Sequence, residues 1–419
     1  MKKIKYAVIG VGNRGKQLMD TMMTIEGIEC VAVCDLRLDF AEHASELYVK
    51  KGFSKPAVYT DYKKCIDEAK LDAVIVSTAW EAHTKVSLYA IERKIPVGCE
   101  VGGAYSINQL WELVNAQEKY ETPVMLLENC CYGRLELMAL NMKRLGVFGE
   151  IVQCEGAYCH DLRYEVVLHG TAKNLTHYRL EEYKRRNTEN YPTHEIGPIA
   201  KLLDINCGNK FTYLHSFATK SAGMESYIKD KGYKHFTSKE FTNEERDANA
   251  ESLAGTKFLQ GDIITTVIGC QNGENIIIHL DTCLPRNYSR RFAVHGTKAF
   301  LNEENNSLFL DNTYTPVEEV QWHKNFNNVE KYQKDYDHRI WANYNPDEND
   351  GHGGMDFLVL SAFFDALKEN KPMPIDIYDM ATWMAIAPLA EESIATHNTV
   401  YFPDFTNGKW IRRKNEFEL

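Results

Sequence analysis

A short apolar run near the start of the chain leads directly into a glycine-rich turn, Ile4-Lys5-Tyr6-Ala7-Val8-Ile9-Gly10-Val11-Gly12-Asn13-Arg14-Gly15. The run is typical of a buried strand, and the residues that follow the turn favour a helix. In this setting Gly10 allows a tight turn, Gly12 lets backbone amides approach a pyrophosphate, and Gly15 lets the helix pack closely on the strand. Together with Asn13 and Arg14, these glycines predict a phosphate-binding turn for a dinucleotide.

An acidic residue ends the next predicted strand, Val31-Ala32-Val33-Cys34-Asp35. A carboxylate at this place accepts hydrogen bonds from the adenosine ribose and repels a 2′-phosphate. Asp35 therefore favours NAD over NADP as the cofactor. The alternative is a structural turn followed by an unrelated surface acid, which does not explain why the glycines lie between a strand and a helix.

Residues 1–128 alternate short apolar segments with longer amphipathic ones. Strands are predicted at Tyr6–Ile9, Cys30–Cys34, Ala73–Val76, Pro96–Cys99 and Val124–Leu127, and helices at Leu38–Lys50, Lys85–Arg93 and Ile107–Tyr120. This order predicts an α/β domain, a Rossmann fold with a doubly wound parallel sheet. Because such sheets bind ligands where their strands end, the further cofactor-binding candidates are Thr78, Trp80, His83 and Glu100.

Residues 129–419 show longer, alternating strand patterns. These strands are predicted at Glu150–Tyr158, Lys210–Ala218, Asp262–Gly269, Glu274–Asp281, Arg291–Gly296 and Ser307–Asp311. They indicate an α+β domain with a largely antiparallel sheet, which binds substrate and supports oligomerisation. An exposed sheet face makes a homo-oligomer the expected state. Asp376–His397 is predicted to be a helix with an Asp cap and a kink at Pro388.

Composition and charge exclude several classes of protein. The chain has 419 residues, of which 44% are hydrophobic and 26% charged, as in a globular protein of two domains. The net charge of -11 and the lack of a Lys/Arg-rich run argue against nucleic acid or an anionic membrane as a partner. The N-terminus lacks a signal-peptide pattern and the eleven cysteines are scattered. We therefore expect a cytoplasmic protein with reduced thiols, unless an export signal has been removed.

Several motifs resemble the Gfo/Idh/MocA family of sugar-active NAD(P) proteins. Sugar dehydrogenases of that family carry Glu-Lys-Pro where this chain has Glu100-Val101-Gly102, and their Lys serves in proton transfer. The missing ammonium group favours a subgroup that also lacks it, glycoside hydrolase family 109, the NAD-dependent α-N-acetylgalactosaminidases. The chain is similar to this subgroup at Leu127–Tyr132, Glu155–Arg163, Asn190–His194, Leu284–Ser289 and Gly351–Asp356.

The resemblance implies a hydrolysis that passes through a transient oxidation of the sugar. NAD takes a hydride from C3, a base removes the acidified C2 proton, and the C1 leaving group departs. Water then adds to the unsaturated sugar, and the hydride returns to C3. The implied substrate is a small glycoside, and the protein has to orient it and move protons.

Two pairs of residues are the catalytic candidates. Tyr191 and His194 lie just before a helical stretch that we expect to start near Pro198. A nearby helix N-terminus disfavours imidazolium, so we expect a neutral His194 that can accept a proton. Tyr158 and His160 alternate on a strand and so share a face, where Tyr158 would exchange a proton with the reacting hydroxyl. The alternatives are a turn with a capping His and an ordinary cross-strand aromatic pair.

Substrate binding is assigned to three further residues of the same motifs, Glu128, Arg163 and Tyr288. No H-E-x-x-H or facial-triad spacing occurs, so we expect no catalytic metal. Two alternatives for the function stay open at this point. One is a true NAD-dependent sugar dehydrogenase of the same fold, and the other is a nucleotide-binding regulator without catalysis.

Overall fold

The first of two sheets in the computed structural model is parallel and has six strands, in the order β3-β2-β1-β4-β5-β6. The model describes residues 3–102, 104–168, 177–235, 242–311, 326–347, 350–415 and 417. The strands are β1 (Ile4–Ile9), β2 (Ile28–Cys34), β3 (Ala57–Tyr59), β4 (Ala73–Val76), β5 (Val97–Cys99) and β6 (Val124–Leu126). This is the doubly wound order, in which ligands bind at the carboxyl ends of β1 and β4, where the strand order reverses. The predicted fold of this region is confirmed.

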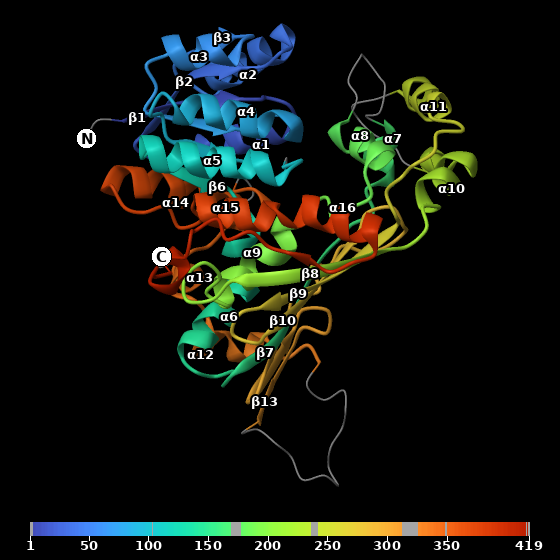
Figure 1. Cartoon of the computed structure of the whole chain (residues 1–419). Coiled ribbons are helices and arrows are strands. Elements are labelled where there is room, and N and C mark those ends of the chain that lie inside the picture. Colours follow the sequence, from blue (N-terminus) through green and yellow to red (C-terminus); the bar gives the residue numbers. More distant parts are fainter. Residues whose placement is uncertain are drawn as a thin grey trace.

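Five helices connect these strands (Figure 1). They are α1 (Asn13–Met22), α2 (Leu38–Lys50), α3 (Tyr62–Glu68), α4 (Trp80–Ile91) and α5 (Ile107–Tyr120). Helix α4 begins at Trp80, where a helix was predicted only from Lys85. The short β3 and α3 were not predicted, because three and seven residues carry too little periodicity to be recognised.

The second sheet has eight strands in the order β13-β12-β11-β7-β10-β9-β8-β14. They are β7 (Ile151–Cys159), β8 (Phe211–Ala218), β9 (Ile263–Cys270), β10 (Asn275–Asp281), β11 (Ala293–Gly296), β12 (Ala299–Asn302), β13 (Ser307–Leu310) and β14 (Val400–Tyr401). Every pairing is antiparallel except that of β7 with β10. The prediction of a largely antiparallel sheet is confirmed, although β12 and β14 were not predicted.

Among the helices of this second region, those within residues 163–185 and 223–252 form a group to one side with a hydrophobic core of its own (Figure 1). The helices of the region are α6 (Arg134–Arg144), α7 (Arg163–Leu168), α8 (Tyr178–Arg185), α9 (Thr193–Leu202), α10 (Gly223–Lys229), α11 (Asn243–Ser252), α12 (Glu330–Tyr336), α13 (Arg339–Ala342), α14 (Met355–Glu369), α15 (Ile377–Met384) and α16 (Ile386–Thr396). Helix α9 lies so close to β7 that a Cβ at Gly156 would come within 2.5 Å of a carbonyl oxygen of α9.

The last helices return to the first sheet. The Tyr6 ring of β1 lies 5.4 Å from the Phe364 ring of α14, and the Leu126 amide of β6 donates to the Ile375 carbonyl. One hydrophobic core therefore joins both sheets. A domain boundary between residues 128 and 129 stays a prediction.

The long helix expected at Asp376–His397 is two helices, α15 and α16, which meet at Ala385. Asp376 caps the first of them, as predicted, and accepts hydrogen bonds from two backbone amides. The break comes three residues before Pro388, which has no amide hydrogen to continue the helix across this point. Within the described ranges, no helix is both long enough and apolar enough to cross a membrane.

Candidate functional site

The glycine-rich turn has the shape that a pyrophosphate requires. Gly10 has a φ of +91°, and a Cβ there would lie 2.6 Å from the backbone of Ser77. A Cβ at Gly15 would lie 2.2 Å from the Gly10 carbonyl oxygen, so α1 packs tightly on the turn. At Gly12, by contrast, no atom lies within 4 Å of that position. The space above Gly12, at the N-terminus of α1, fits a bound phosphate.

Asp35 lies directly beside this turn. One carboxylate oxygen accepts a hydrogen bond from the Val11 amide at 2.9 Å, and the other accepts one from the Arg37 amide at 3.0 Å. Each oxygen keeps a second lone pair, which suits the hydroxyls of a ribose. The residues of the first sheet thus fit a dinucleotide, with Asn13 as the first residue of α1.

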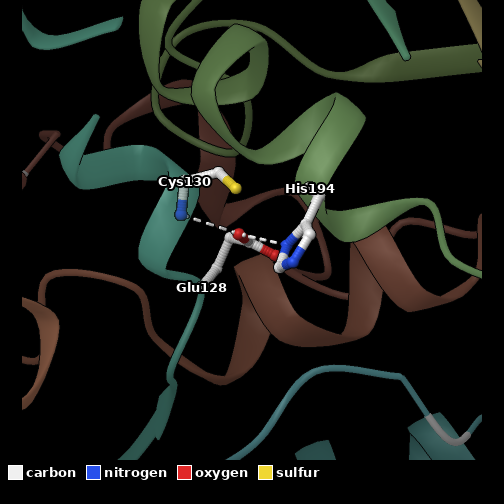
Figure 2. A group of neighbouring side chains, drawn as sticks. All are labelled: Glu128, Cys130 and His194. Carbon is white, nitrogen blue, oxygen red and sulfur yellow. Dashed lines mark hydrogen bonds and ion pairs between the residues drawn. The ribbon is translucent and has the colours of Figure 1, made fainter. Parts of the chain in front are cut away.

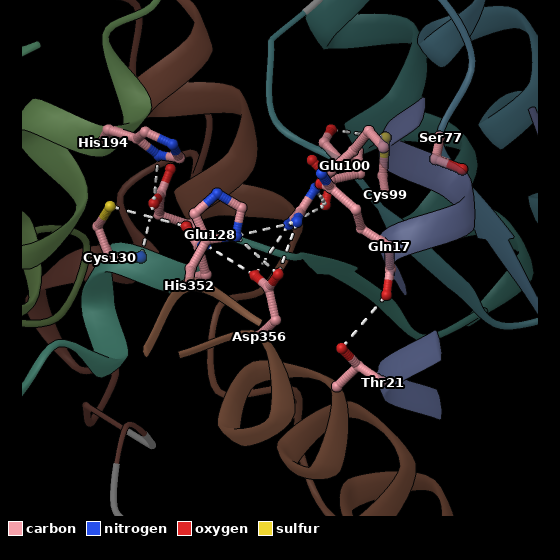
Figure 3. Close-up of polar contacts among 12 residues, drawn as sticks. Gln17, Thr21, Ser77, Cys99, Glu100, Glu128, Cys130, His194, His352 and Asp356 are labelled. Carbon is pink, nitrogen blue, oxygen red and sulfur yellow. Dashed lines mark hydrogen bonds and ion pairs between the residues drawn. The ribbon is translucent and has the colours of Figure 1, made fainter. Parts of the chain in front are cut away.

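Arg14 and Glu100, both predicted to bind the cofactor, are paired with each other. The Arg14 guanidinium donates to Glu100 at 2.9 Å and to Asp356 of α14 at 2.6 Å. Asp356 also accepts hydrogen bonds from His352 Nδ1 at 2.8 Å and from the side-chain amide of Asn129 at 2.8 Å (Figure 3). This network links the phosphate-binding turn to α14 and to the residue that precedes Cys130.

The segment after β4 makes contact with the second region. Trp80 is buried, and its ring stacks on that of Tyr191 at 5.5 Å. The two ring nitrogens of His83 lie 2.9 Å from the carbonyl oxygens of Thr78 and Gly102. These three predicted residues thus hold together the turns that follow β4 and β5, at the carboxyl edge of the sheet.

A buried cluster forms where β6 meets α9. We call Glu128, Cys130 and His194 the Glu128 cluster (Figure 2). The side chains of the cluster point toward one another, and His194 Nδ1 donates to a Glu128 carboxylate oxygen at 2.7 Å. The same oxygen accepts from the Cys130 amide at 3.0 Å. Glu128 is fully buried, so its charge is shielded from water.

Two expectations about His194 are wrong. Helix α9 begins at Thr193 instead of near Pro198, so His194 lies in its first turn. Burial acts to lower the pKa of His194, but electrostatic and hydrogen-bond interactions with Cys130 and Glu128 outweigh it and raise the pKa to about 10. The carboxylate, which could not be placed beside His194 from the sequence, thus overrides the effect of the helix N-terminus.

Aromatic side chains surround the exposed edge of His194, and we call Tyr158, Tyr191 and His194 the aromatic group. The Tyr158 ring lies 4.7 Å from Tyr191 and 5.5 Å from His194, and Tyr191 lies 4.8 Å from His194. His160, just beyond the end of β7, has its Nδ1 3.4 Å from the Tyr158 hydroxyl. Burial raises the pKa of Tyr158 to about 12. The four residues predicted to be catalytic therefore lie together.

The substrate-binding candidates are divided. Tyr288 lies 5.3 Å from the His160 ring and is half exposed, so it borders the aromatic group on the solvent side. Glu128 belongs to the cluster beneath that group. Arg163 instead forms an ion pair with Asp161 and lies over the Tyr227 ring, and neither contact joins it to the other candidates.

Arg179 of α8 was not predicted, yet it lies among the same rings. Its side chain is buried, and its Nε and Nη1 atoms have no hydrogen-bond partner among the described residues. The guanidinium carbon lies close to four ring centroids, Tyr191 at 4.5 Å, Trp80 at 5.1 Å, Tyr178 at 5.5 Å and Tyr158 at 5.7 Å. Two buried guanidinium nitrogens without acceptors are costly, and they point to a ligand that supplies acceptors. No sequence motif marks this residue.

Comparisons with known proteins agree with this geometry. Residues 4–127 match the model of the oxidoreductase family with an NAD-binding Rossmann fold, and residues 132–412 match the C-terminal domain of glycosyl hydrolase 109. A glycosyl hydrolase family 109 protein of Stenotrophomonas maltophilia is 38% identical over 99% of this chain and 92% of its own length. An alpha-N-acetylgalactosaminidase of Tannerella forsythia is 34% identical over 99% of this chain and 89% of its own.

Among solved structures, the fold is similar to that of a levoglucosan dehydrogenase in complex with NADH and L-sorbose. The TM-score is 0.68 at 16% identity, over 96% of this chain and all of the other. This likeness shows the fold alone. The family match covers more than half of the chain, and the relatives match over nearly all of it. The chain therefore belongs to glycosyl hydrolase family 109, built on an NAD-binding Rossmann domain of the Gfo/Idh/MocA type.

Proposed function

We propose that this protein hydrolyses terminal α-N-acetylgalactosaminides with NAD as a permanently bound cofactor. The observation that carries the proposal is the aromatic group of Tyr158, Tyr191 and His194 at the carboxyl edge of the dinucleotide sheet. The lysine that sugar dehydrogenases use for proton transfer is replaced by the buried Val101. The relative from Tannerella forsythia, an alpha-N-acetylgalactosaminidase by name, supports the substrate.

The cofactor would be held by the first sheet. The amides around Gly12 would bind its pyrophosphate, and Asp35 would accept hydrogen bonds from the ribose hydroxyls and disfavour a 2′-phosphate. When bound, NAD supplies a reversible hydride acceptor for C3 of the sugar. Arg14 and Glu100 hold the turn against α14 through their ion pairs.

The proton transfers belong to the aromatic group. The Tyr158 hydroxyl exchanges a proton with the C3 hydroxyl and, through His160 at 3.4 Å, with solvent. Tyr191 and His194, whose rings lie 4.8 Å apart, flank the C2 proton. Glu128 fixes the ring of His194 by accepting a hydrogen bond from its Nδ1. This leaves Nε2 as the nitrogen that can face the sugar.

Substrate recognition would use the groups around this centre. Tyr288 borders it on the solvent side, and Arg179 offers two buried nitrogens, Nε and Nη1, whose N–H groups have no acceptor among the described residues. A carbonyl or hydroxyl oxygen of the sugar would satisfy them. Arg163 would contact only the outer part of a glycoside, because Asp161 and Tyr227 hold its side chain.

Self-association is part of the proposal. On one face of the second sheet, large side chains are exposed on β8, β13 and β14, namely Tyr213, Phe217, Phe309 and Tyr401. A patch of this kind favours a homo-oligomer. Sedimentation velocity of the purified protein measures the oligomeric state, and a monomer at micromolar concentration would contradict self-association.

Hydrolysis of chromogenic glycosides tests the function. We expect aglycone release from an α-N-acetylgalactosaminide without added NAD and without a net change in NADH absorbance. Release from the matching α-galactoside should be slower, because it lacks the acetamido carbonyl. Accumulation of NADH on free sugars, with no aglycone release, would instead identify a dehydrogenase.

A further inference from the structure

The Glu128 cluster has the composition of a zinc site. A carboxylate, a thiol and an imidazole each offer one ligand atom, and these atoms all lie within 4.8 Å of one another (Figure 2). Glu128 and Cys130 come from the segment after β6, and His194 comes from the first turn of α9. In a tetrahedral zinc site, ligand atoms are about 3.5 Å apart. The three side chains therefore need only small rotations to reach one ion.

The second carboxylate oxygen of Glu128 gives independent support. It is buried, and no described residue forms a hydrogen bond with it. A buried carboxylate oxygen without a donor is unfavourable, and a cation is one group that satisfies it. The positive charge of Arg290, which acts on Cys130, is already paired with Glu136 at 2.7 Å. The charge of Arg290 therefore opposes a cation in the Glu128 cluster only weakly.

The ligand set also selects the kind of cation. Thiolate and imidazole suit zinc and similar ions, whereas magnesium and calcium take oxygen ligands. Three protein ligands leave a fourth position open, as in zinc sites that exchange a water. The side chain of His194 is 13% exposed, so the cluster is not sealed from solvent on that side.

We propose that Glu128, Cys130 and His194 bind one zinc ion, which blocks the active site. The ion replaces the proton between His194 Nδ1 and Glu128 and the proton of the Cys130 thiol, and both protons leave to solvent. His194 is then held by the metal and no longer serves the sugar. Zinc would thus act as an inhibitor. This effect on turnover rests on the proposed function, whereas binding itself does not.

Cobalt reports this site directly, because a thiolate ligand gives Co²⁺ a charge-transfer absorption in the near ultraviolet. The full-length protein is first treated with a chelator and then titrated with Co²⁺ alone. We expect the band to saturate at one ion per chain and to disappear when Zn²⁺ is added. Cys130→Ser should lose the band. The matched control is Cys131→Ser, whose thiol is also buried but lies outside the cluster, and it should keep the band.

Three results would overturn the zinc site. They are no saturable band in the wild type, an undiminished band in Cys130→Ser, and loss of the band in Cys131→Ser while that variant remains folded by circular dichroism. Zn²⁺ should also raise the melting temperature of the wild type, which does not depend on any variant. Zinc binding that leaves glycoside turnover unchanged would keep the metal site and contradict the placement of the active site.

Discussion

The Glu128 carboxylate accepts a 2.7 Å hydrogen bond from His194 Nδ1, although the two residues are 66 positions apart in the sequence. This contact joins the end of the dinucleotide sheet to the helix that carries the proposed catalytic imidazole. It also fixes which ring nitrogen of His194 can face a substrate. The geometry of the whole site depends on it.

Glu128→Gln tests this contact with little change in shape. An amide keeps one acceptor but loses the charge that orients the imidazole, so we expect turnover to fall roughly 10- to 100-fold, as for other partners that orient a functional histidine. NAD affinity should stay the same. Steady-state kinetics and fluorescence of bound NADH measure the two quantities, and an unchanged kcat would show that the contact does not serve catalysis.

Tyr191→Phe removes a hydroxyl and keeps the ring that stacks on Trp80. If Tyr191 moves a proton, turnover should fall about 10²- to 10⁴-fold while NAD binding persists. Tyr48→Phe is the matched control, because Tyr48 is equally buried but lies in α2 and bonds to Tyr6. Equal activity in the two variants would remove Tyr191 from the mechanism.

One added methyl group should have different effects at Gly12 and at Gly15. A Cβ at Gly15 would lie 2.2 Å from a backbone oxygen, so Gly15→Ala should lower the melting temperature clearly. A Cβ at Gly12 meets nothing within 4 Å, so Gly12→Ala should fold normally and bind NAD more weakly. Scanning calorimetry and NADH titration separate the effects. Normal NAD affinity in Gly12→Ala would contradict the position of the pyrophosphate.

Asp356→Asn tests the link between the phosphate-binding turn and α14. Removing this fully buried partner of Arg14 should lower the free energy of unfolding at pH 7 by about 3–5 kcal/mol. Burial acts to raise the pKa of Asp356, but hydrogen bonds from His352 and Arg14 outweigh it and hold the pKa below its usual value.

The pH dependence of this difference follows from the lowered pKa. The stability from Asp356 is fully present above its unfolded pKa, about 3.9, and is lost as the pH falls toward the folded pKa. Urea unfolding should therefore show the gap between wild type and Asp356→Asn shrinking below about pH 4. A gap that stays constant down to pH 3 would contradict the pairing.

Arg179→Met separates binding from stability. Replacing a buried guanidinium that has two unsatisfied nitrogens by an apolar side chain should leave the free energy of unfolding unchanged or raise it. The same change removes the two unsatisfied nitrogens, Nε and Nη1, among the site rings, so KM should rise. Thermal unfolding measures the stability of the variant, and steady-state kinetics measure its KM and kcat. A stable variant with normal KM and kcat would show that Arg179 does not bind substrate.

The sequence predicts the first sheet well, because its strands are short, apolar and separated by strong turn signals. Residue order also brings Tyr158 and His160 to one face, since strand side chains alternate. The protonation of His194 could not be predicted, because it depends on Glu128, which is close only in space. Arg179 was missed for a similar reason: only the fold shows that it is buried among four rings.

Hydrolysis by the proposed route passes through removal of the C2 proton of the sugar. Incubating the protein with a chromogenic α-N-acetylgalactosaminide in deuterated water, without added NAD, measures this directly. We expect aglycone release and one deuterium at C2 of the released sugar, seen by NMR or mass spectrometry. Aglycone release with only hydrogen at C2 would contradict this route.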